Sequence, residues 1–371
     1  MQIYADYAAT TPLSDRVYDT LCRTARDFFG NPSSAHAAGR AAADIVDRAR
    51  EQTAALLGCD PDEIVFTSGG TEADNHALRW AAGKTILASA IEHSAVLETV
   101  REVAGRFCPM LPDTGGQVSV TEVARVLREA SDPALVSLMY ANNETGVIQP
   151  VREAADAAHA AGALFHCDAV QGVGHGMPDV RALGCDLMSV SGHKFHAPKG
   201  IGALYIRRGI ADRIPPLLYG GGQQDGRRSG TLPVPLIAAF GEACAEALER
   251  REEDDAHIRG LRDAIAAELR DIPDSLVIGG GERMPGILNI AFAGTYGESL
   301  MLLCDLRGVC LSAGSACHAG DDTPSHVLTA MDVPAEYRSS AIRISVGRYT
   351  TKEEAERIAA VVRDCVRMAR E

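Results

Sequence analysis

Half of the lysines in this 371-residue chain fall within one short segment. The chain has only four lysines, at positions 84, 194, 199 and 352, and its other 32 basic residues are arginines. Lys194 and Lys199 follow the apolar segment 187–191, which we predict to be a buried strand. A desolvated lysine is the usual Schiff-base former in proteins. The segment therefore indicates Schiff-base chemistry, with a structural role as the alternative for Lys199.

A turn rich in glycine and hydroxyl groups follows the apolar segment 64–67, which also reads as a buried strand. It comprises residues 68–75, with the sequence SGGTEADN, and leads into a helical pattern. Glycines let the backbone approach a ligand closely. Free N–H groups at a helix start, together with the hydroxyls of Ser68 and Thr71, suit a phosphate. An ordinary strand–turn–helix connection is the alternative, because glycine turns are common.

An acid follows a third apolar segment. Asp168 comes directly after residues 163–167. A carboxylate at the mouth of a buried strand can hold a cationic ring nitrogen, although a capping aspartate is the alternative. Ligands of mostly parallel sheets lie at the carboxyl ends of the strands, where these polar residues cluster.

The ten cysteines contain no C-x-x-C pair, which disfavours a zinc ribbon or a thioredoxin-type site. A chain of this length does not need the disulfide framework of small secreted domains. Most of the thiols are therefore expected to be small buried hydrophobes. Cys317 differs from Cys167, Cys185 and Cys304, because it lies among small residues and glycine (LSAGSACHAG, residues 311–320). That setting predicts an exposed loop, with a chance loop cysteine as the alternative.

Short apolar runs alternate with longer amphipathic stretches over the first two thirds of the chain. The predicted strands are residues 64–67, 85–89, 135–140, 163–167, 187–191 and 202–206, and the predicted helices include residues 38–57, 72–82, 121–130 and 151–161. Strand–helix alternation with apolar strands predicts an α/β fold, in which a mostly parallel central sheet is flanked by helices.

The last third of the chain has a different pattern. Residues 236–270 form a long, heavily charged helical pattern that we predict to lead away from the sheet. Short strands at 276–278, 287–292 and 341–346 and a terminal helix at 352–369 follow. We predict a large domain over residues 14–250. A smaller α+β domain would combine residues 1–13 with residues 251–371, including the segment of Cys317.

Composition excludes several classes of function. The chain has 36 basic and 50 acidic residues, and its net charge of -14 disfavours bulk attraction to nucleic acid or an anionic membrane. Apolar residues make up 46% and charged residues 23%, as in a soluble globular protein. The first residues lack a basic start and a long apolar run, so we expect no signal peptide. No apolar run is long enough to span a membrane, and a cytoplasmic location is expected.

A phosphate cup, a partner for a pyridinium nitrogen and a Schiff-base lysine together describe a pyridoxal phosphate site. With these parts in view, the sequence resembles the cysteine desulfurases of the NifS/IscS type, in the class V aminotransferase family. The resemblance implies fold type I of the pyridoxal phosphate enzymes. The matching segments, in family order, are residues 4–12, 30–42, 66–75, 91–96, 141–150, 166–171, 191–205, 220–234, 312–320 and 341–351.

The resemblance also implies residue roles. The cofactor-binding residues that it implies are Gly70, Thr71, His93, Asn143, Asp168, Gln171, Ser191, His193, Lys194 and Thr231. Lys194 would carry the cofactor, Asp168 would pair with the pyridine N–H, and Gln171 would face the phenolic oxygen. His93 would stack on the ring and move protons. Thr231 would reach the phosphate of the neighbouring subunit, which implies a homodimer.

The implied reaction converts L-cysteine to L-alanine and leaves the sulfur on the enzyme. Asn143 and Arg343 would bind the substrate, with Arg343 as a two-donor fork on its carboxylate. Lys194 would remove the Cα proton, and the thiolate of Cys317 would take the sulfur as a persulfide. His318 follows Cys317 directly. An imidazolium there would favour the thiolate, whereas a solvated loop histidine is the alternative.

Three other functions remain open at this point. The S-A-C-H stretch around Cys317 also resembles selenocysteine lyases, which share the fold and the cofactor site. A non-enzymatic sulfur-carrier or assembly subunit would retain pyridoxal phosphate only for structure. An ordinary aminotransferase would need a keto acid but no loop nucleophile, so Cys317→Ser would spare it.

The sulfur acceptor is not identified by the sequence. Iron–sulfur cluster assembly, through a scaffold protein, and other thiolation pathways are the expected destinations. The chain ends directly after its last predicted helix, without the tail by which IscS-type proteins often dock a scaffold. No resident metal is predicted. Cys317 as a ligand to a cluster held by a partner is a further hypothesis.

Overall fold

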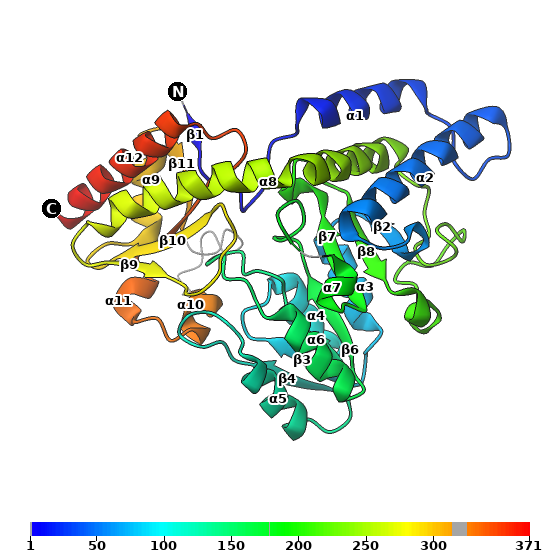
Figure 1. The fold of residues 1–371 in the computed structure, drawn as a ribbon, viewed down its shortest axis with the longest axis horizontal. Helices are drawn as coiled ribbons and strands as arrows, with labels where there is room; N and C mark the ends of the chain where they lie inside the picture. The colour runs from blue at the N-terminus through cyan, green and yellow to red at the C-terminus, as the bar shows by residue number, and fades with distance from the viewer. Residues whose placement is uncertain (1, 178, 314–324) are drawn as a thin grey trace.

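The computed structural model describes residues 2–177, 179–313 and 325–371. In these residues a seven-stranded sheet and a four-stranded sheet lie at opposite ends of one long helix, α8 (Figure 1). Within the described ranges, no helix is long and apolar enough to cross a membrane.

The seven-stranded sheet has the order β2-β8-β7-β6-β5-β3-β4. Its strands are β2 (Ile64–Thr67), β3 (Thr85–Ser89), β4 (Arg106–Met110), β5 (Pro133–Ser137), β6 (Leu164–Asp168), β7 (Leu187–Ser191) and β8 (Gly202–Ile206). β8 runs antiparallel to both of its neighbours, and every other pair of adjacent strands is parallel. The mostly parallel sheet that the apolar runs predict is therefore confirmed.

Helices cover both faces of this sheet, because consecutive apolar residues of each strand point to opposite faces. Phe165 and Met188 join one core cluster, whereas the preceding Leu164 and Leu187 join another. The first cluster takes in residues of α2 (Ala37–Leu57), α6 (Val151–Ala160), α7 (Val180–Leu183) and the first half of α8 (Val234–Arg270). The second takes in α3 (Gly70–Arg79) and α4 (Ser94–Val103).

Further elements complete the large sheet region. They are α1 (Asp15–Asp27), which packs on α8, α5 (Val120–Glu129), and the 3-10 helices η1 (Pro61–Glu63), η2 (Gly192–Lys194) and η3 (Arg208–Arg213).

The four-stranded sheet is antiparallel throughout, with the order β12-β13-β10-β9. Its strands are β9 (Ser275–Ile278), β10 (Ile287–Phe292), β12 (Ser312–Ala313) and β13 (Ala341–Ser345), and its helices are α9 (Gly297–Asp305), α10 (His326–Ala330), α11 (Ala335–Arg338) and α12 (Lys352–Arg370). The N-terminus also reaches this region, because β1 (Ile3–Tyr4) pairs in parallel with β11 (Val309–Cys310). Ile3 and Ala5 pack in the same core cluster as the second half of α8.

Two sequence expectations differ from the fold. The strand expected over residues 135–140 ends at Ser137, although Leu138 and Tyr140 still donate backbone hydrogen bonds to β6. β4 is absent from the predicted strands because it is an edge strand that includes Arg106 and Pro109 rather than a continuous apolar run. The division into residues 14–250 and residues 1–13 with 251–371 stays a prediction.

Candidate active site

A cavity of about 580 Å³ lies at the carboxyl ends of β6 and β7, against the start of α3. Ten of the predicted site residues line it: Gly70, Thr71, His93, Asn143, Asp168, Gln171, Ser191, His193, Lys194 and Arg343. Thr231 is exposed and does not line this cavity. Cys317 and His318 lie outside the described residues. The fold thus gathers residues from six separate sequence segments around one space, while their roles stay predictions.

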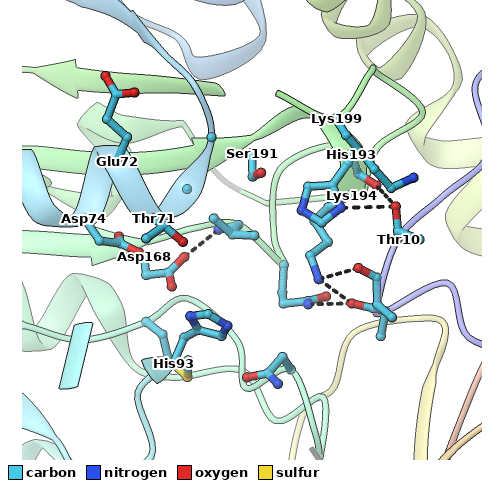
Figure 2. Close-up of a pocket in the computed structure, with 18 of the residues that line it drawn as sticks. Thr10, Thr71, Glu72, Asp74, His93, Asp168, Ser191, His193, Lys194 and Lys199 are labelled. Atoms are coloured by element: carbon cyan, nitrogen blue, oxygen red, sulfur yellow. Dashed lines mark hydrogen bonds between the residues drawn. The ribbon is translucent and has the colours of Figure 1, made fainter. Parts of the chain in front are cut away.

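Lys194 enters the cavity from the short helix η2, directly after β7. Its Nζ donates to the backbone carbonyls of Ala8 at 2.5 Å and Ala9 at 3.0 Å (Figure 2). The N-terminal segment is held there because Thr11 donates twice to the carbonyl of His193, from its N–H at 2.9 Å and from its hydroxyl at 3.0 Å. The amine is thereby presented to the cavity from a fixed backbone.

Asp168 is the last residue of β6, and its side chain is buried under the cavity. The backbone N–H of Val170 donates to its Oδ1 at 2.9 Å. Burial raises the pKa of Asp168, whereas the charges of His93 and Lys194 and this N–H lower it. An acid in this position can pair with one cationic group that enters the cavity.

Two histidines border the cavity from opposite sides (Figure 2). His93 caps α4, and the N–H of Ala95 donates to its Nδ1 at 3.1 Å, so the neutral ring carries its hydrogen on Nε2. His193 lies 3.2 Å from the hydroxyl of Thr10 through its Nδ1. Burial and the charges of Lys194 and Lys199 lower the pKa of His193 to about 4, so this ring is neutral near pH 7.

The start of α3 forms a backbone cup for an anion. α3 begins at Gly70, and its N-cap residue Gly69 has a φ of 151° and makes no side-chain capping bond. A Cβ atom on Gly70 would lie 2.8 Å from a methyl group of Val170, and one on Gly202 would lie 2.8 Å from the Cα of Gly69. Only glycine fits these positions, and the N–H groups of the first turn stay open to an anionic ligand.

Arg343 approaches the cavity from the other sheet, on β13, and is 1% exposed. Its Nη1 donates to the carbonyl of Asn143 at 2.7 Å, and its Nη2 donates to Asp6 at 2.9 Å and to Ser312 at 3.3 Å. Its Nε has no hydrogen-bond partner among the described residues. A buried guanidinium that lines the cavity and whose Nε–H is unpaired among these residues can receive a carboxylate.

Sequence reasoning missed two acids at this site. Asp74 lines the cavity from α3, and Asp6 contacts Arg343 from the N-terminal segment. The signal for Asp74 was an acid on the apolar face of a helix, between Ala73 and Ala77, where a solvated acid is out of place. No local pattern indicates the contact of Asp6, because 337 positions separate it from Arg343.

The described residues on either side of the predicted nucleophile loop both lie beside the cavity. Ser312 pairs with Arg343 in the register of β12 and β13. On the other side, Ser325 donates to Glu144 at 2.6 Å, and His326 contacts the carbonyl of Glu92 at 3.0 Å. The described residues on both sides of the segment that contains Cys317 therefore lie near this site.

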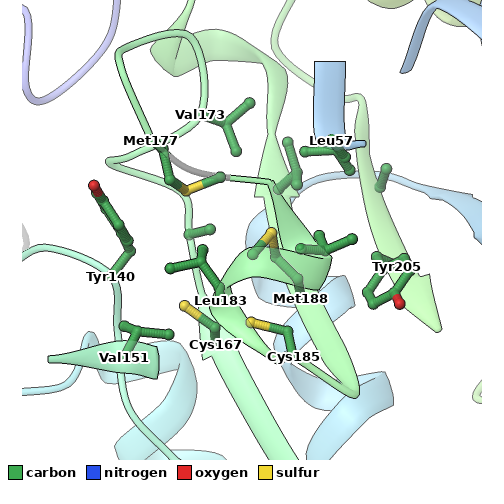
Figure 3. Packing of buried hydrophobic residues seen from close by; sticks show 14 of the residues in the cluster. Leu57, Tyr140, Val151, Cys167, Val173, Met177, Leu183, Cys185, Met188 and Tyr205 are labelled. Atoms are coloured by element: carbon green, nitrogen blue, oxygen red, sulfur yellow. The ribbon is translucent and has the colours of Figure 1, made fainter. Parts of the chain in front are cut away.

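Five of the nine cysteines in the described ranges are buried, as most thiols were expected to be. Cys167 and Cys185 pack with Met188 and Leu183 beneath the sheet (Figure 3), and burial raises the pKa of Cys167 well above that of a free thiol. These thiols are poor nucleophiles in this state. Over the same ranges, no group of three or more His, Cys, Asp or Glu side chains is arranged to hold a metal ion.

Comparison with known proteins agrees with this geometry. Residues 3–358 match the family described as Aminotransferase class-V. The chain belongs to the class-V aminotransferase family. This is a family of pyridoxal phosphate-dependent enzymes, so the predicted family and fold type are confirmed.

Individual members of the family match the chain over almost its whole length. It is 42% identical to a protein named cysteine desulfurase IscS from Dictyoglomus turgidum, over 95% of this chain and 91% of that protein. It is 41% identical to the protein of the same name from Methanosarcina thermophila, over 99% of this chain and 93% of that one. A solved structure called a NifS-like protein shares 35% identity and a TM-score of 0.92, covering 99% of this chain and 100% of its own. The structure titled SspA in complex with cysteine shares 32% identity and a TM-score of 0.83, over 95% and 100% of the two chains.

Proposed function

We propose that this chain is a pyridoxal phosphate-dependent cysteine desulfurase. It converts L-cysteine to L-alanine and leaves the sulfur on Cys317 as a persulfide, for delivery to iron–sulfur cluster assembly or another thiolation pathway. The observation that carries the proposal is the meeting of Lys194, Asp168 and Arg343 at one cavity, because these are the amine, the acid and the carboxylate receptor that the reaction needs. The names of the relatives support the same activity.

The residues of the cavity fit pyridoxal phosphate. The glycine turn at the start of α3 suits the phosphate, with Thr71 and Ser191 beside it, because the N–H groups of a helix start bind anions. Asp168 is a buried acid that lines the cavity, which suits the ring nitrogen. Lys194 supplies the amine that holds the cofactor covalently.

Bound in this way, the cofactor supplies an electron-withdrawing ring that stabilises negative charge at the Cα of an amino acid. Arg343 binds the substrate carboxylate and orients the Cα–H bond. The free amine of Lys194 removes the proton from Cα and later returns a proton to the product. Asp168 keeps the ring nitrogen protonated, because a buried carboxylate stabilises a cation next to it.

Cys317 completes the transfer of sulfur. Its thiolate bonds to the sulfur of the substrate as the bond between that sulfur and the substrate Cβ breaks. The electron pair of the broken bond stays on carbon, which takes up a proton. The products are alanine and an enzyme persulfide, so the step needs no external oxidant.

Alanine and sulfide release from L-cysteine, with a reductant present, tests the proposal. We expect the wild type to release both products and Cys317→Ser to release neither, whereas the control Cys22→Ser, at an exposed cysteine of α1, should match the wild type. Cysteine-dependent alanine formation that survives in Cys317→Ser would overturn the role of Cys317. An absence of alanine from the wild type would overturn the activity itself.

We also propose that the active form is a homodimer, in which Thr231 contacts the phosphate in the neighbouring subunit. Its exposure, away from the cavity of its own chain, supports this reading. Thr231→Ala should lower cofactor affinity while the oligomeric mass stays unchanged. Wild-type affinity in this variant would contradict the proposal.

A further inference from the structure

A row of buried polar side chains crosses three strands beneath the cavity. The two ring nitrogens of His166 on β6 lie 2.9 Å from the hydroxyl of Ser137 on β5 and 3.0 Å from that of Ser189 on β7. All three residues are fully buried. Burying polar groups is costly unless they are hydrogen-bonded, so each member of this row depends on the next.

Asp74 of α3 ends the row at the cavity wall. It is 1% exposed, and its Oδ1 lies 3.6 Å from the Nε2 of His166, too far for a hydrogen bond. This oxygen has no hydrogen-bond partner among the described residues. Figure 2 shows Asp168 just below Asp74 and Thr71, and the two acids are close enough to interact electrostatically. Two acids therefore share one buried space, and the proposed reaction uses only Asp168.

The surroundings of the two acids decide which one carries the charge. Asp168 receives the N–H of Val170 and faces the charges of His93 and Lys194. At Asp74, burial and the nearby acids Asp168 and Glu92 raise the pKa. They outweigh a hydrogen bond with Ser189, which lowers it.

His166 does not favour the ionisation of Asp74. Burial lowers the pKa of His166 to about 3, so its ring is neutral and supplies no cation. Burial and the charge of Asp168 raise the pKa of Asp74 well above its usual range. Carboxylates that share a buried site do not both ionise.

We propose that Asp74 is a positioning residue that stays protonated, so that Asp168 is the carboxylate that faces the ring nitrogen of the cofactor. Ser189, at the end of the buried polar row, hydrogen-bonds to Asp74 and fixes its place. The inference rests on the proposed function and adds a residue to its site. Asp74 acts through Asp168 and not on the substrate.

Infrared difference spectra of the purified full chain test the proton directly. Carbonyl stretching of a carboxylic acid is separate from the carboxylate bands, so wild type minus Asp74→Asn should show one lost acid band. Asp19→Asn, at an exposed acid of α1, should show a lost carboxylate band instead. A lost carboxylate band for Asp74→Asn would overturn the proposal, whether or not the protein binds cofactor.

The visible absorbance of the bound cofactor, titrated against pH, tests the positioning role. Asp74→Asn keeps a neutral hydrogen-bonding group, so its midpoint should stay within about 0.3 pH units of the wild type. Asp74→Ala removes the group and should shift the midpoint by about one unit, and Asp168→Asn should shift it further. A shift in Asp74→Asn as large as that in Asp168→Asn, or no shift in Asp74→Ala, would overturn the proposal. A wild type without cofactor absorbance would instead refute the proposed function.

Discussion

Two buried clusters of charged side chains differ in whether their acids have partners within the protein. In the first, the α8 cluster, Arg348 donates through Nη1 to Glu246 and through Nε to Asp254, both at 2.7 Å. Ser14 donates to the second oxygen of Glu246 at 2.5 Å. The second, the cavity cluster, contains the acids Asp74, Glu92 and Asp168, and one oxygen each of Asp74 and Glu92 has no hydrogen-bond partner among the described residues.

The difference indicates what each cluster does. In the α8 cluster the largely buried Arg348 contacts both acids. These ion pairs link α8 to the segment after β13, and their charges are balanced without a ligand. Asp74 and Asp168 line the cavity, Glu92 is buried near them, and this cluster can receive a cationic group from outside. We therefore expect changes to the α8 cluster to act on stability and changes to the cavity cluster to act on activity.

The largest effect is expected for Asp168→Asn. Without the carboxylate the ring nitrogen loses its proton, and we expect kcat for alanine formation to fall roughly 10³- to 10⁴-fold, the scale of a lost electrostatic or acid–base group. The free energy of unfolding should not fall, because the variant removes a buried charge. Steady-state kinetics at saturating cofactor and chemical denaturation check the two parts. A loss below tenfold with cofactor bound would contradict the role.

Arg348→Met should show the opposite pattern. It leaves the buried Glu246 without its cation and Asp254 with only Arg250, at 3.3 Å, so the free energy of unfolding should fall by about 3–5 kcal/mol. The kcat of the folded protein should stay within about threefold of the wild type, because Arg348 does not line the 580 Å³ cavity and only borders a smaller pocket of about 50 Å³ beside Lys194.

Arg363→Met is the matched control. Its partner Glu268 is exposed, so the loss there should stay below about 1 kcal/mol. Equal losses in the two variants would contradict the distinction.

Residues at strand ends could be predicted from the sequence, and contacts between distant elements could not. Lys194 and Asp168 follow apolar strands of a parallel sheet, and the carboxyl ends of such strands converge, so their order along the chain already indicates their place. The position of Asp74 on the apolar face of α3 marks it as an unusual acid but does not show what it contacts. Its neighbours depend on how α3 packs on β6 and β7, which no local pattern encodes.

The same limit applies to the second sheet. Arg343 was identified through the family resemblance, but its contact with Asp6 depends on the N-terminal segment crossing between the two sheets. The strand β1 that anchors this segment has two residues, too few for a periodic pattern.

Glu92→Gln tests the cavity cluster through pH. Burial raises the pKa of Glu92 to about 8, and the charge of Asp168 adds to this. The folded state therefore keeps a proton that the unfolded state releases above about pH 4.5. This group makes the protein less stable as pH rises from about 5 to 8, by at most about 1.4 kcal/mol per pH unit, and no further above pH 8. The variant should lose this slope and exceed the wild type by up to about 4 kcal/mol at pH 8.

Denaturation curves at several pH values check this prediction. Glu298→Gln, at an exposed acid of α9, is the control and should keep the slope of the wild type. Equal slopes in the wild type and Glu92→Gln would mean that Glu92 is ionised in the folded protein, and the cavity cluster would then hold more than one charge.

The smallest effect is expected at Arg343, which combines features of both clusters. Its Nη2 donates to Asp6, and its buried Nε has no hydrogen-bond partner among the described residues. Asp6→Asn keeps an oxygen that accepts the hydrogen bond but removes a negative charge that competes with the substrate carboxylate. We expect KM for L-cysteine to fall about two- to fivefold with little change in kcat, a gain of about 1 kcal/mol or less in ground-state binding. If KM rises instead, the charge of Asp6 is needed to orient the guanidinium. Arg343 would then resemble Arg348 of the α8 cluster, which depends on its acidic partners.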